Sequence, residues 1–115
     1  MNINELTLGQ IKEIQALVGG TAGKPEANGH WKVGFNYFVR TVTHHFTGTL
    51  VAVTDKELVL VDAAWIADDG RFNECIADGT CSEVEPFPDG QEVIIGRGSL
   101  IDATRWIHGL PRTVK

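Results

Sequence analysis

The expected fold rests on Val93-Ile94-Ile95-Gly96-Arg97-Gly98-Ser99-Leu100-Ile101, an apolar run interrupted by Gly-Arg-Gly. Such a run is typical of a short β-strand that stops and then resumes. Glycines on both sides of Arg97 allow positive φ angles that other residues avoid, and they let a ligand come close to the backbone. We therefore expect two short strands, over residues 93–95 and 99–103, with a sharp corner between them.

A second strand-forming region precedes this stretch, over residues 31–62. Residues 31–39 are aromatic and predict an extended segment, and residues 38–53 are rich in β-branched side chains, with Gly48 near the middle. A glycine inside a strand usually marks a bulge or a sharp bend. A small barrel needs such a bend, because one strand serves both sides of the closed sheet. After a polar turn, residues 58–61 predict a short buried strand.

The N-terminal part predicts one helix and a connection. Over residues 5–18, apolar side chains fall on one helical face: Leu8, Ile11, Ile14, Leu17 and Val18. Two glycines then supply a stop signal. Residues 19–30 are rich in Gly, Ala, Pro and Asn, which predicts a flexible connection.

The charge is distributed unevenly along the chain. The formal net charge is −5, yet nine carboxylates lie between Asp62 and Glu92 against Arg71 alone. We interpret residues 63–92 as an acidic insertion between the third and fourth strands of a barrel, and residues 93–115 as the final strands and a basic C-terminal segment. A strongly acidic protein repels polyanions at long range, so binding to double-stranded DNA is not expected. The three arginines of the last segment could still build a local basic pocket.

Length and composition predict one soluble domain over residues 1–115. Hydrophobic residues make up 43% and charged residues 22%, and a chain of this size buries about 65% of its unfolded surface. We expect no signal peptide and no membrane segment, because no apolar run approaches the required length of about 20 residues. A cytoplasmic location follows. Cys75 and Cys81 could bridge in an oxidising compartment, but in the cytoplasm we expect two free thiols.

The two strand regions together resemble the paired signatures of the Sm-like small β-barrel family. The first signature, apolar positions around a fixed glycine, is matched by Val39, Val42, Gly48, Leu50, Val53, Leu58 and Leu60. Asp62 falls near a common acidic position, and Arg97-Gly98-Ser99-Leu100-Ile101 matches the second signature. The resemblance implies a mainly β fold, with an N-terminal α-helix followed by a five-stranded bent β-barrel that assembles into a homo-oligomeric ring. Another small barrel, such as an SH3-like one, is the alternative.

One departure from the Sm pattern bears on the ligand. Sm proteins that grip uridine-rich RNA carry an Asp and an Asn in the turn after the second strand, but here that turn is Thr54-Asp55-Lys56-Glu57. Sm-type RNA binding is therefore not the first expectation. The chain, notably residues 62–72, is also similar to small phage and prophage proteins of unassigned activity, which implies a viral origin.

Six residues are candidates for a ligand site at the subunit boundary: Arg97, Gly98, His44, His45, Arg105 and Trp106. The guanidinium of Arg97 offers a planar fork for phosphate or a base edge, and pairing with a carboxylate is the alternative. Strand alternation sends the two histidines to opposite faces, where one reaches a ligand or a neighbouring subunit. Aromatic-plus-arginine groups such as Arg105 and Trp106 stack on bases. The alternative is that Trp106 caps the core while Arg105 is solvated.

No nucleophile–base pair, phosphate-binding glycine loop or metal-ligand spacing is found, so we expect neither an enzyme nor a metal or cofactor. The preferred hypothesis is a non-enzymatic phage protein that binds a small nucleotide at ring subunit boundaries and sequesters a host defence signal. One alternative is an Sm-like ring that binds single-stranded RNA. Another is a virion or host-interaction component that docks through the acidic segment.

Overall fold

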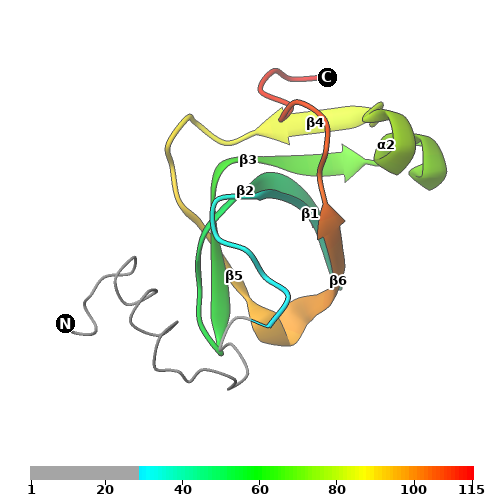
Figure 1. The fold of residues 1–115 in the computed structure, drawn as a ribbon. Helices are drawn as coiled ribbons and strands as arrows, with labels where there is room; N and C mark the ends of the chain where they lie inside the picture. The colour runs from blue at the N-terminus through cyan, green and yellow to red at the C-terminus, as the bar shows by residue number, and fades with distance from the viewer. Residues whose placement is uncertain (1–28) are drawn as a thin grey trace.

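The computed structural model describes residues 29–115, so the helix predicted over residues 5–18 and most of the following connection lie outside the described residues. The mainly β prediction is confirmed for this part, which holds one antiparallel sheet of six strands and one short α-helix (Figure 1). None of its helices is long and apolar enough to cross a membrane. The elements in chain order are β1 (Asn36–Thr41), β2 (His45–Val53), β3 (Glu57–Asp68), α2 (Phe72–Asp78), β4 (Glu83–Pro86), β5 (Val93–Gly96), the 3₁₀ turn η2 (Arg97–Ser99) and β6 (Leu100–Arg105).

Strand β3 pairs with three other strands, β2, β4 and β5. The strand order is β4-β3-β2-β1-β6, and β5 also pairs with β3. The first half of β3 pairs with β5 and its second half with β4, while β2 runs along the other side. The five-stranded barrel is therefore a wrong prediction: there are six strands, and the sheet is not closed because β6 pairs with β1 alone among the described strands.

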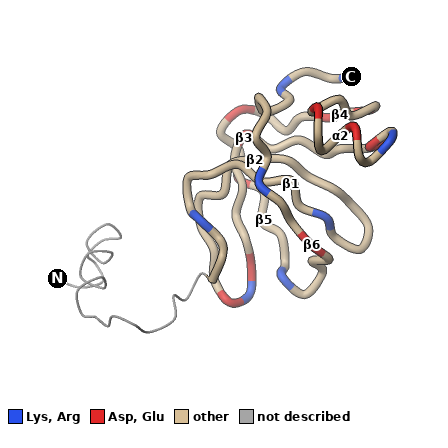
Figure 2. Tube along the Cα trace, turned by 45° about the vertical axis from the view of Figure 1, so that its right-hand side comes forward, with Lys and Arg blue, Asp and Glu red and all other residues tan. Residues whose placement is uncertain are grey.

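The extra strand comes from the segment interpreted as an insertion. Residues 63–68 do not belong to a loop but continue β3, and β4 then pairs with this extension. The insertion between sheet strands is thus shorter than residues 63–92. Figure 2 shows several of the acidic residues around α2 and β4, the two elements that lie wholly within this segment.

The long strand predicted over residues 38–53 is divided by a tight turn. Thr41 closes this turn: its backbone N–H donates to the His44 carbonyl at 2.8 Å, and its hydroxyl oxygen accepts from the His44 N–H at 2.9 Å. The threonine supplies the local hydrogen bonds that an uninterrupted strand would have made with neighbours. Residues 31–35, expected to be extended, precede β1 as turn and irregular backbone.

Gly48 marks a bulge, as predicted. The register between β2 and β3 shifts there, so that two residues of β3, Asp62 and Ala63, face one residue of β2. Asp62 adopts a φ of 52°, which a bulge of this kind requires. A Cβ atom at position 48 would lie 3.1 Å from the Leu60 Cβ and 3.2 Å from the Ala63 Cα. Only glycine fits this approach without displacing the neighbouring strand.

Both faces of the sheet carry apolar clusters, because alternate residues of β1 point to opposite sides. The first cluster consists of Tyr37, Val39, Leu50, Leu58, Leu60, Ala63, Val93 and Ile95. The second consists of Phe38, Ala64, Ile66, Cys75, Cys81, Val84 and Trp106. The residues after β3 therefore cover the second face rather than forming a peripheral loop.

The two cysteines are joined within that cover. Cys75 of α2 and Cys81, six residues later, form a disulfide, and both side chains are buried. The expectation of two free thiols is therefore wrong. The turn between them brings the sulfur atoms together, with Gly79 ending α2 in the left-handed conformation.

Candidate functional site

Arg97 connects the turn between β5 and β6 to the turn between β2 and β3 through hydrogen bonds. Its backbone N–H donates to the Lys56 carbonyl at 2.9 Å, and its guanidinium donates to the Thr54 carbonyl. The expected corner is present, but neither Gly96 nor Gly98 uses the positive φ angle that a glycine allows. The corner between β5 and β6 is an ordinary 3₁₀ turn fastened to the β2–β3 turn. Arg97 is neither paired with a carboxylate nor extended into solvent.

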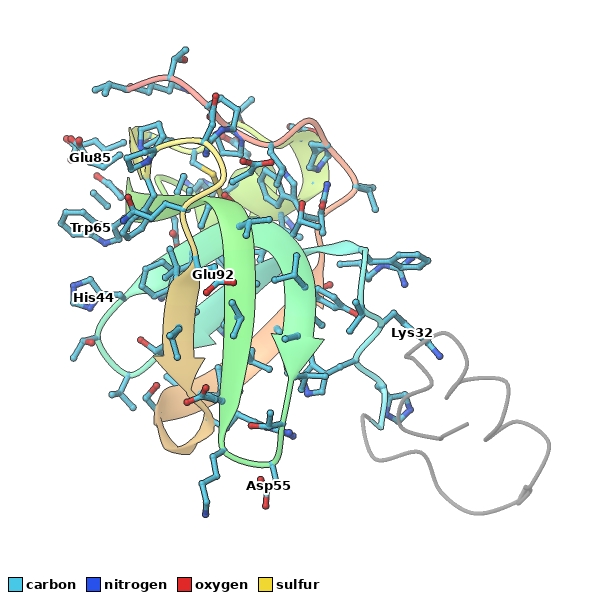
Figure 3. All side chains as sticks on the ribbon, turned by 90° about the vertical axis from the view of Figure 1, so that its left-hand side faces the viewer. Lys32, His44, Asp55, Trp65, Glu85 and Glu92 are labelled. Carbon is cyan, nitrogen blue, oxygen red and sulfur yellow. A yellow bond between two sulfur atoms is a disulfide. The ribbon has the colours of Figure 1, made fainter. Side chains whose placement is uncertain are left out.

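The two histidines have different surroundings, but strand alternation does not apply to them as predicted, because only His45 belongs to β2. His44 is exposed in the β1–β2 turn, and its ring centroid lies 5.4 Å from that of Trp65 (Figure 3). His45 is half-buried, with Nδ1 3.0 Å from both carboxylate oxygens of Asp69. Its ring meets Phe38 edge-on at 5.7 Å. The His45 ring is therefore fixed by contacts within the protein, whereas the His44 ring is exposed to solvent.

Trp106 and Arg105 take different roles although they are adjacent. Trp106 is 5% exposed, stacks on Phe38 with a centroid distance of 5.9 Å, and donates its indole N–H to the Gly109 carbonyl at 3.1 Å. Trp106 therefore covers the core, as in the alternative given for it in the sequence analysis. The Arg105 side chain is exposed, and its Cζ lies 3.8 Å from the centroid of the Phe35 ring.

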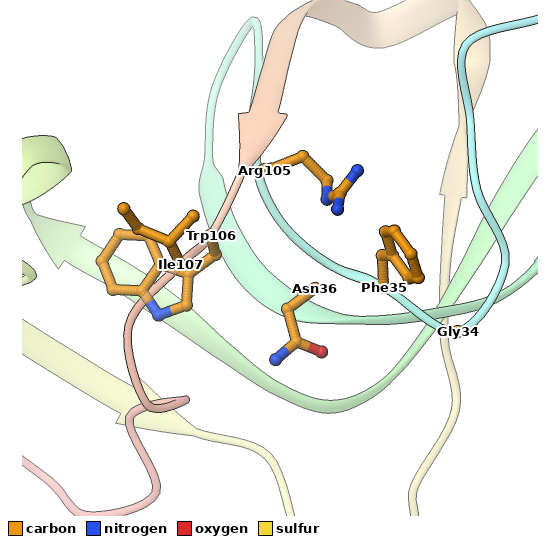
Figure 4. Close-up of a pocket in the computed structure, with 6 residues that line it drawn as sticks. All are labelled: Gly34, Phe35, Asn36, Arg105, Trp106 and Ile107. Carbon is orange, nitrogen blue, oxygen red and sulfur yellow. The ribbon is translucent and has the colours of Figure 1, made fainter.

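A shallow depression of about 310 Å³ surrounds the Arg105 side chain (Figure 4). It is lined by Gly34, Phe35, Asn36, Arg105, Trp106 and Ile107. Phe35 is 43% exposed and Ile107 81% exposed. The Asn36 side-chain oxygen accepts from the Thr49 hydroxyl at 2.6 Å, which leaves the amide NH₂ as the remaining polar group. The depression thus combines aromatic and aliphatic surface with a cation and an amide donor.

The six predicted residues do not share one pocket within a single chain. Leu100 pairs with Thr41 at one end of β6 and Arg105 pairs with Tyr37 at the other, a separation of about 17 Å along a strand. Arg105 and Trp106 line the depression, whereas Arg97 and Gly98 belong to the distant corner. Whether a second subunit brings these groups together stays a prediction.

Sequence reasoning missed Phe35 and Asn36. The aromatic character of residues 31–39 is visible in the sequence, but it predicts only an extended segment and marks neither residue as a ligand group. Phe35 instead lies just before β1, where Gly34 has a φ of 97°. That position turns the ring outward to the Arg105 guanidinium. The signal available in the sequence was the glycine directly before Phe35.

Three of the four other arginines, Arg40, Arg97 and Arg112, have side-chain partners within the described part of the chain. Arg112 donates to the Ala63 and Phe87 carbonyls at 2.9 and 2.7 Å, and to Asp89 at 2.6 Å. Arg40 forms a two-point pair with Asp102, and this hydrogen bonding holds the pKa of the Asp102 carboxyl below its usual range.

Arg105 differs from these arginines. Within residues 29–115 its guanidinium has no hydrogen-bond or salt-bridge partner, and it lies only against the Phe35 ring. Its guanidinium is therefore free to receive an anion from solution at the depression that it lines.

The described residues contain no group of three His, Cys, Asp or Glu side chains that could hold a metal ion. Comparisons with protein-family models, with curated proteins and with solved structures found no match for this chain.

Proposed function

We propose that the protein binds a small nucleotide in the depression formed by Phe35, Asn36 and Arg105. The observation that carries this proposal is an exposed guanidinium, without a partner among the described residues, 3.8 Å from an exposed aromatic ring. A guanidinium binds phosphate oxygens through parallel hydrogen bonds. Aromatic and arginine side chains together stack on bases. The phosphate would lie at Arg105, and the base would extend over Phe35 toward Ile107.

The size and charge of the site favour a short ligand. Its volume of about 310 Å³ lies at the lower end of the range of roughly 300–1,000 Å³ that small-molecule pockets cover. One free guanidinium suits one or two phosphates. A longer strand would extend over a protein with a net charge of −5, which repels polyanions. These features support a mononucleotide over single-stranded RNA.

Assembly is part of the same proposal. Strand β6 has one paired side among the described strands, and an unpaired strand edge invites addition of a strand from another chain. Arg105 is the last residue of β6, so a subunit added along this edge would border the depression. The Sm-like relationship is supported by the order of elements: the glycine-bearing strand, a segment inserted before the last two strands, and the Arg97 corner between them. Sequestration of a host nucleotide signal, the use that the phage resemblance suggests, would require this binding step.

Calorimetric titration with a nucleoside, its monophosphate and its diphosphate tests the proposal. Arg105→Met keeps the aliphatic stem and removes the guanidinium, so monophosphate affinity should fall about ten- to a hundredfold. Phe35→Leu should weaken the nucleotide by removing the stacking surface, with little effect on ribose phosphate. Arg71→Met, an exposed arginine next to α2, is the matched control and should bind like the wild type. A folded Arg105→Met variant with unchanged affinity would remove the depression as the site.

A further inference from the structure

A row of aromatic side chains lies on the surface where β2, β3 and the residues after β4 meet. It consists of His44, Phe46, Trp65 and Phe87, referred to below as the aromatic row. The centroid of the His44 ring lies 5.4 Å from that of Trp65 and 6.1 Å from that of Phe46. The ring centroids of Phe46 and Phe87 are 6.3 Å apart. The four rings therefore form one continuous surface built from segments far apart in the sequence.

One side of the aromatic row packs on the core, and the other side is open to solvent. Phe46 and Phe87 are half-buried and pack against the first core cluster. Trp65 is 38% exposed, although it lies within the second half of the longest strand, and His44 is exposed. Rings held in this way lose little conformational freedom when a partner covers them, which favours binding.

Carboxylates border the aromatic row. Glu85 of β4 lies directly opposite Trp65 of β3, and opposed residues have Cβ atoms about 5 Å apart. Figure 3 shows Glu85, Trp65 and His44 one below another on the same side of the molecule. Glu83 and Glu85 are exposed, and neither has a salt-bridge partner among the described residues.

We infer that the aromatic row and Glu85 form a docking site for an arginine-bearing segment of a partner protein. The face of an aromatic ring carries negative potential and attracts cations. A planar guanidinium can stack on Trp65 while it donates hydrogen bonds to the Glu85 carboxylate. Lysine has the charge but lacks the flat surface, so arginine fits both halves of the site.

Charge argues against the other occupants of this surface. A purely apolar partner would take the Glu83 and Glu85 carboxylates out of water without compensation. A second copy of this chain docking through the same surface would place these carboxylates against their own equivalents. A nucleic acid would be repelled by the nine carboxylates between Asp62 and Glu92. The site is also separate from the depression at Arg105, whose ligand would be an anion.

Titration of the isotope-labelled protein with a hexapeptide of alternating glycine and arginine, followed by backbone amide NMR, tests this inference. The signals that shift should belong to β2 near His44, to β3 near Trp65 and to β4 near Glu85. A peptide with citrulline, the uncharged analogue of arginine, should cause no comparable shifts. A lysine peptide should bind more weakly than the arginine peptide.

Three variants separate the site from general charge attraction. Trp65→Leu keeps apolar bulk and removes the indole, and it should weaken the arginine peptide about two- to fivefold. Glu85→Gln keeps the shape and removes one exposed ion pair, with a loss of similar size, about two- to fivefold. Asp55→Asn removes an equal charge from the β2–β3 turn, away from the aromatic row in Figure 3, and should leave affinity unchanged.

Two results would overturn the inference. One is equal binding of the citrulline and arginine peptides, which would exclude recognition of the cation. The other is an Asp55→Asn variant that loses as much affinity as Glu85→Gln, which would show attraction to the whole acidic surface. Thermal unfolding of each variant accompanies the titration, and Glu85→Gln, at an exposed position, keeps the test valid if Trp65→Leu is unstable.

Discussion

Replacement of Gly48 by alanine should destabilise the protein through the β2–β3 bulge. The added Cβ would lie 3.1 Å from the Leu60 Cβ and 3.2 Å from both the Cα and the Cβ of Ala63. These contacts are a few tenths of an ångström shorter than ordinary van der Waals contact, and one of them involves backbone. Overpacking of this kind costs about 1–3 kcal/mol. The reduced freedom of the unfolded chain returns about 0.4–1 kcal/mol, so the middle of the two ranges gives a net loss of about 1 kcal/mol.

Gly96→Ala is the matched control for this experiment. Gly96 is also a strand residue, the last of β5, but a Cβ there would meet no atom within 4 Å, and its φ of −69° and ψ of 130° suit alanine. This variant should be as stable as the wild type or more stable by about 0.4–1 kcal/mol. The two proteins contain the same chemical change, so they differ only in the space around the new methyl group.

Urea unfolding at equilibrium measures both variants, and thermal unfolding provides a second reading. The melting temperature of Gly48→Ala should fall by about 4–8 °C, because that is the shift that a loss of about 1 kcal/mol causes in a domain of this size. Equal stability of Gly48→Ala and Gly96→Ala would refute the reasoning. It would mean that β3 moves freely at the bulge, and that Gly48 is not needed for the close approach of the two strands.

Four further outcomes are expected. Arg97→Met removes the hydrogen bond to the Thr54 carbonyl, so it should cost about 1 kcal/mol and speed amide exchange in the β2–β3 turn; loss of nucleotide affinity instead would place the corner in the site. The pKa of Asp102 is lowered by the hydrogen bond from Arg40. The ion pair therefore contributes to the folding stability above the unfolded-state pKa of about 3.9, and this stability is lost as the pH falls through the lower pKa of the folded state. Asp102→Asn should therefore cost at most about 1 kcal/mol at neutral pH and nothing in strong acid, as unfolding at several pH values would show. Reduction of the disulfide, which closes a loop over a sequence separation of six, should lower the stability by about 2 kcal/mol in urea titrations with and without a thiol reagent. Light scattering at micromolar concentration should give a mass above the 12.5 kDa of one chain; a monomer would contradict the predicted assembly.

Several features of the fold follow from local patterns. Gly48 was predicted to mark a bulge because a glycine inside a β-branched strand is unfavourable unless its missing side chain is needed. The break at Gly96-Arg97-Gly98 was predicted because an apolar run with glycines at its centre does not continue as one strand. Both predictions concern residues that are close in sequence, where steric preference decides the structure.

Other features depend on which strands become neighbours. Residues 63–68 continue β3 because β2 pairs with them on one side and β4 on the other, and this pairing with distant segments cannot be deduced from their alternation. The guanidinium of Arg97 reaches a carbonyl at a sequence separation of 43. The glycines on both sides of Arg97 mark it as a candidate ligand group in the sequence. They do not indicate that its guanidinium would bind the carbonyl of Thr54 in the same chain.

The candidate sites were the least accessible to sequence reasoning. Arg105 was predicted as a ligand group, yet its neighbour Phe35 was not, because the two come together only through the pairing of β1 with β6. The sequence by itself determined the strand-forming character of β1, β2, β5 and β6, the bulge at Gly48 and the acidic character of the middle region, since steric preference, side-chain alternation and charge are local properties. The tertiary structure alone decided which of these groups face one another, because strand register and the two-sided burial of the sheet arise from contacts between distant residues.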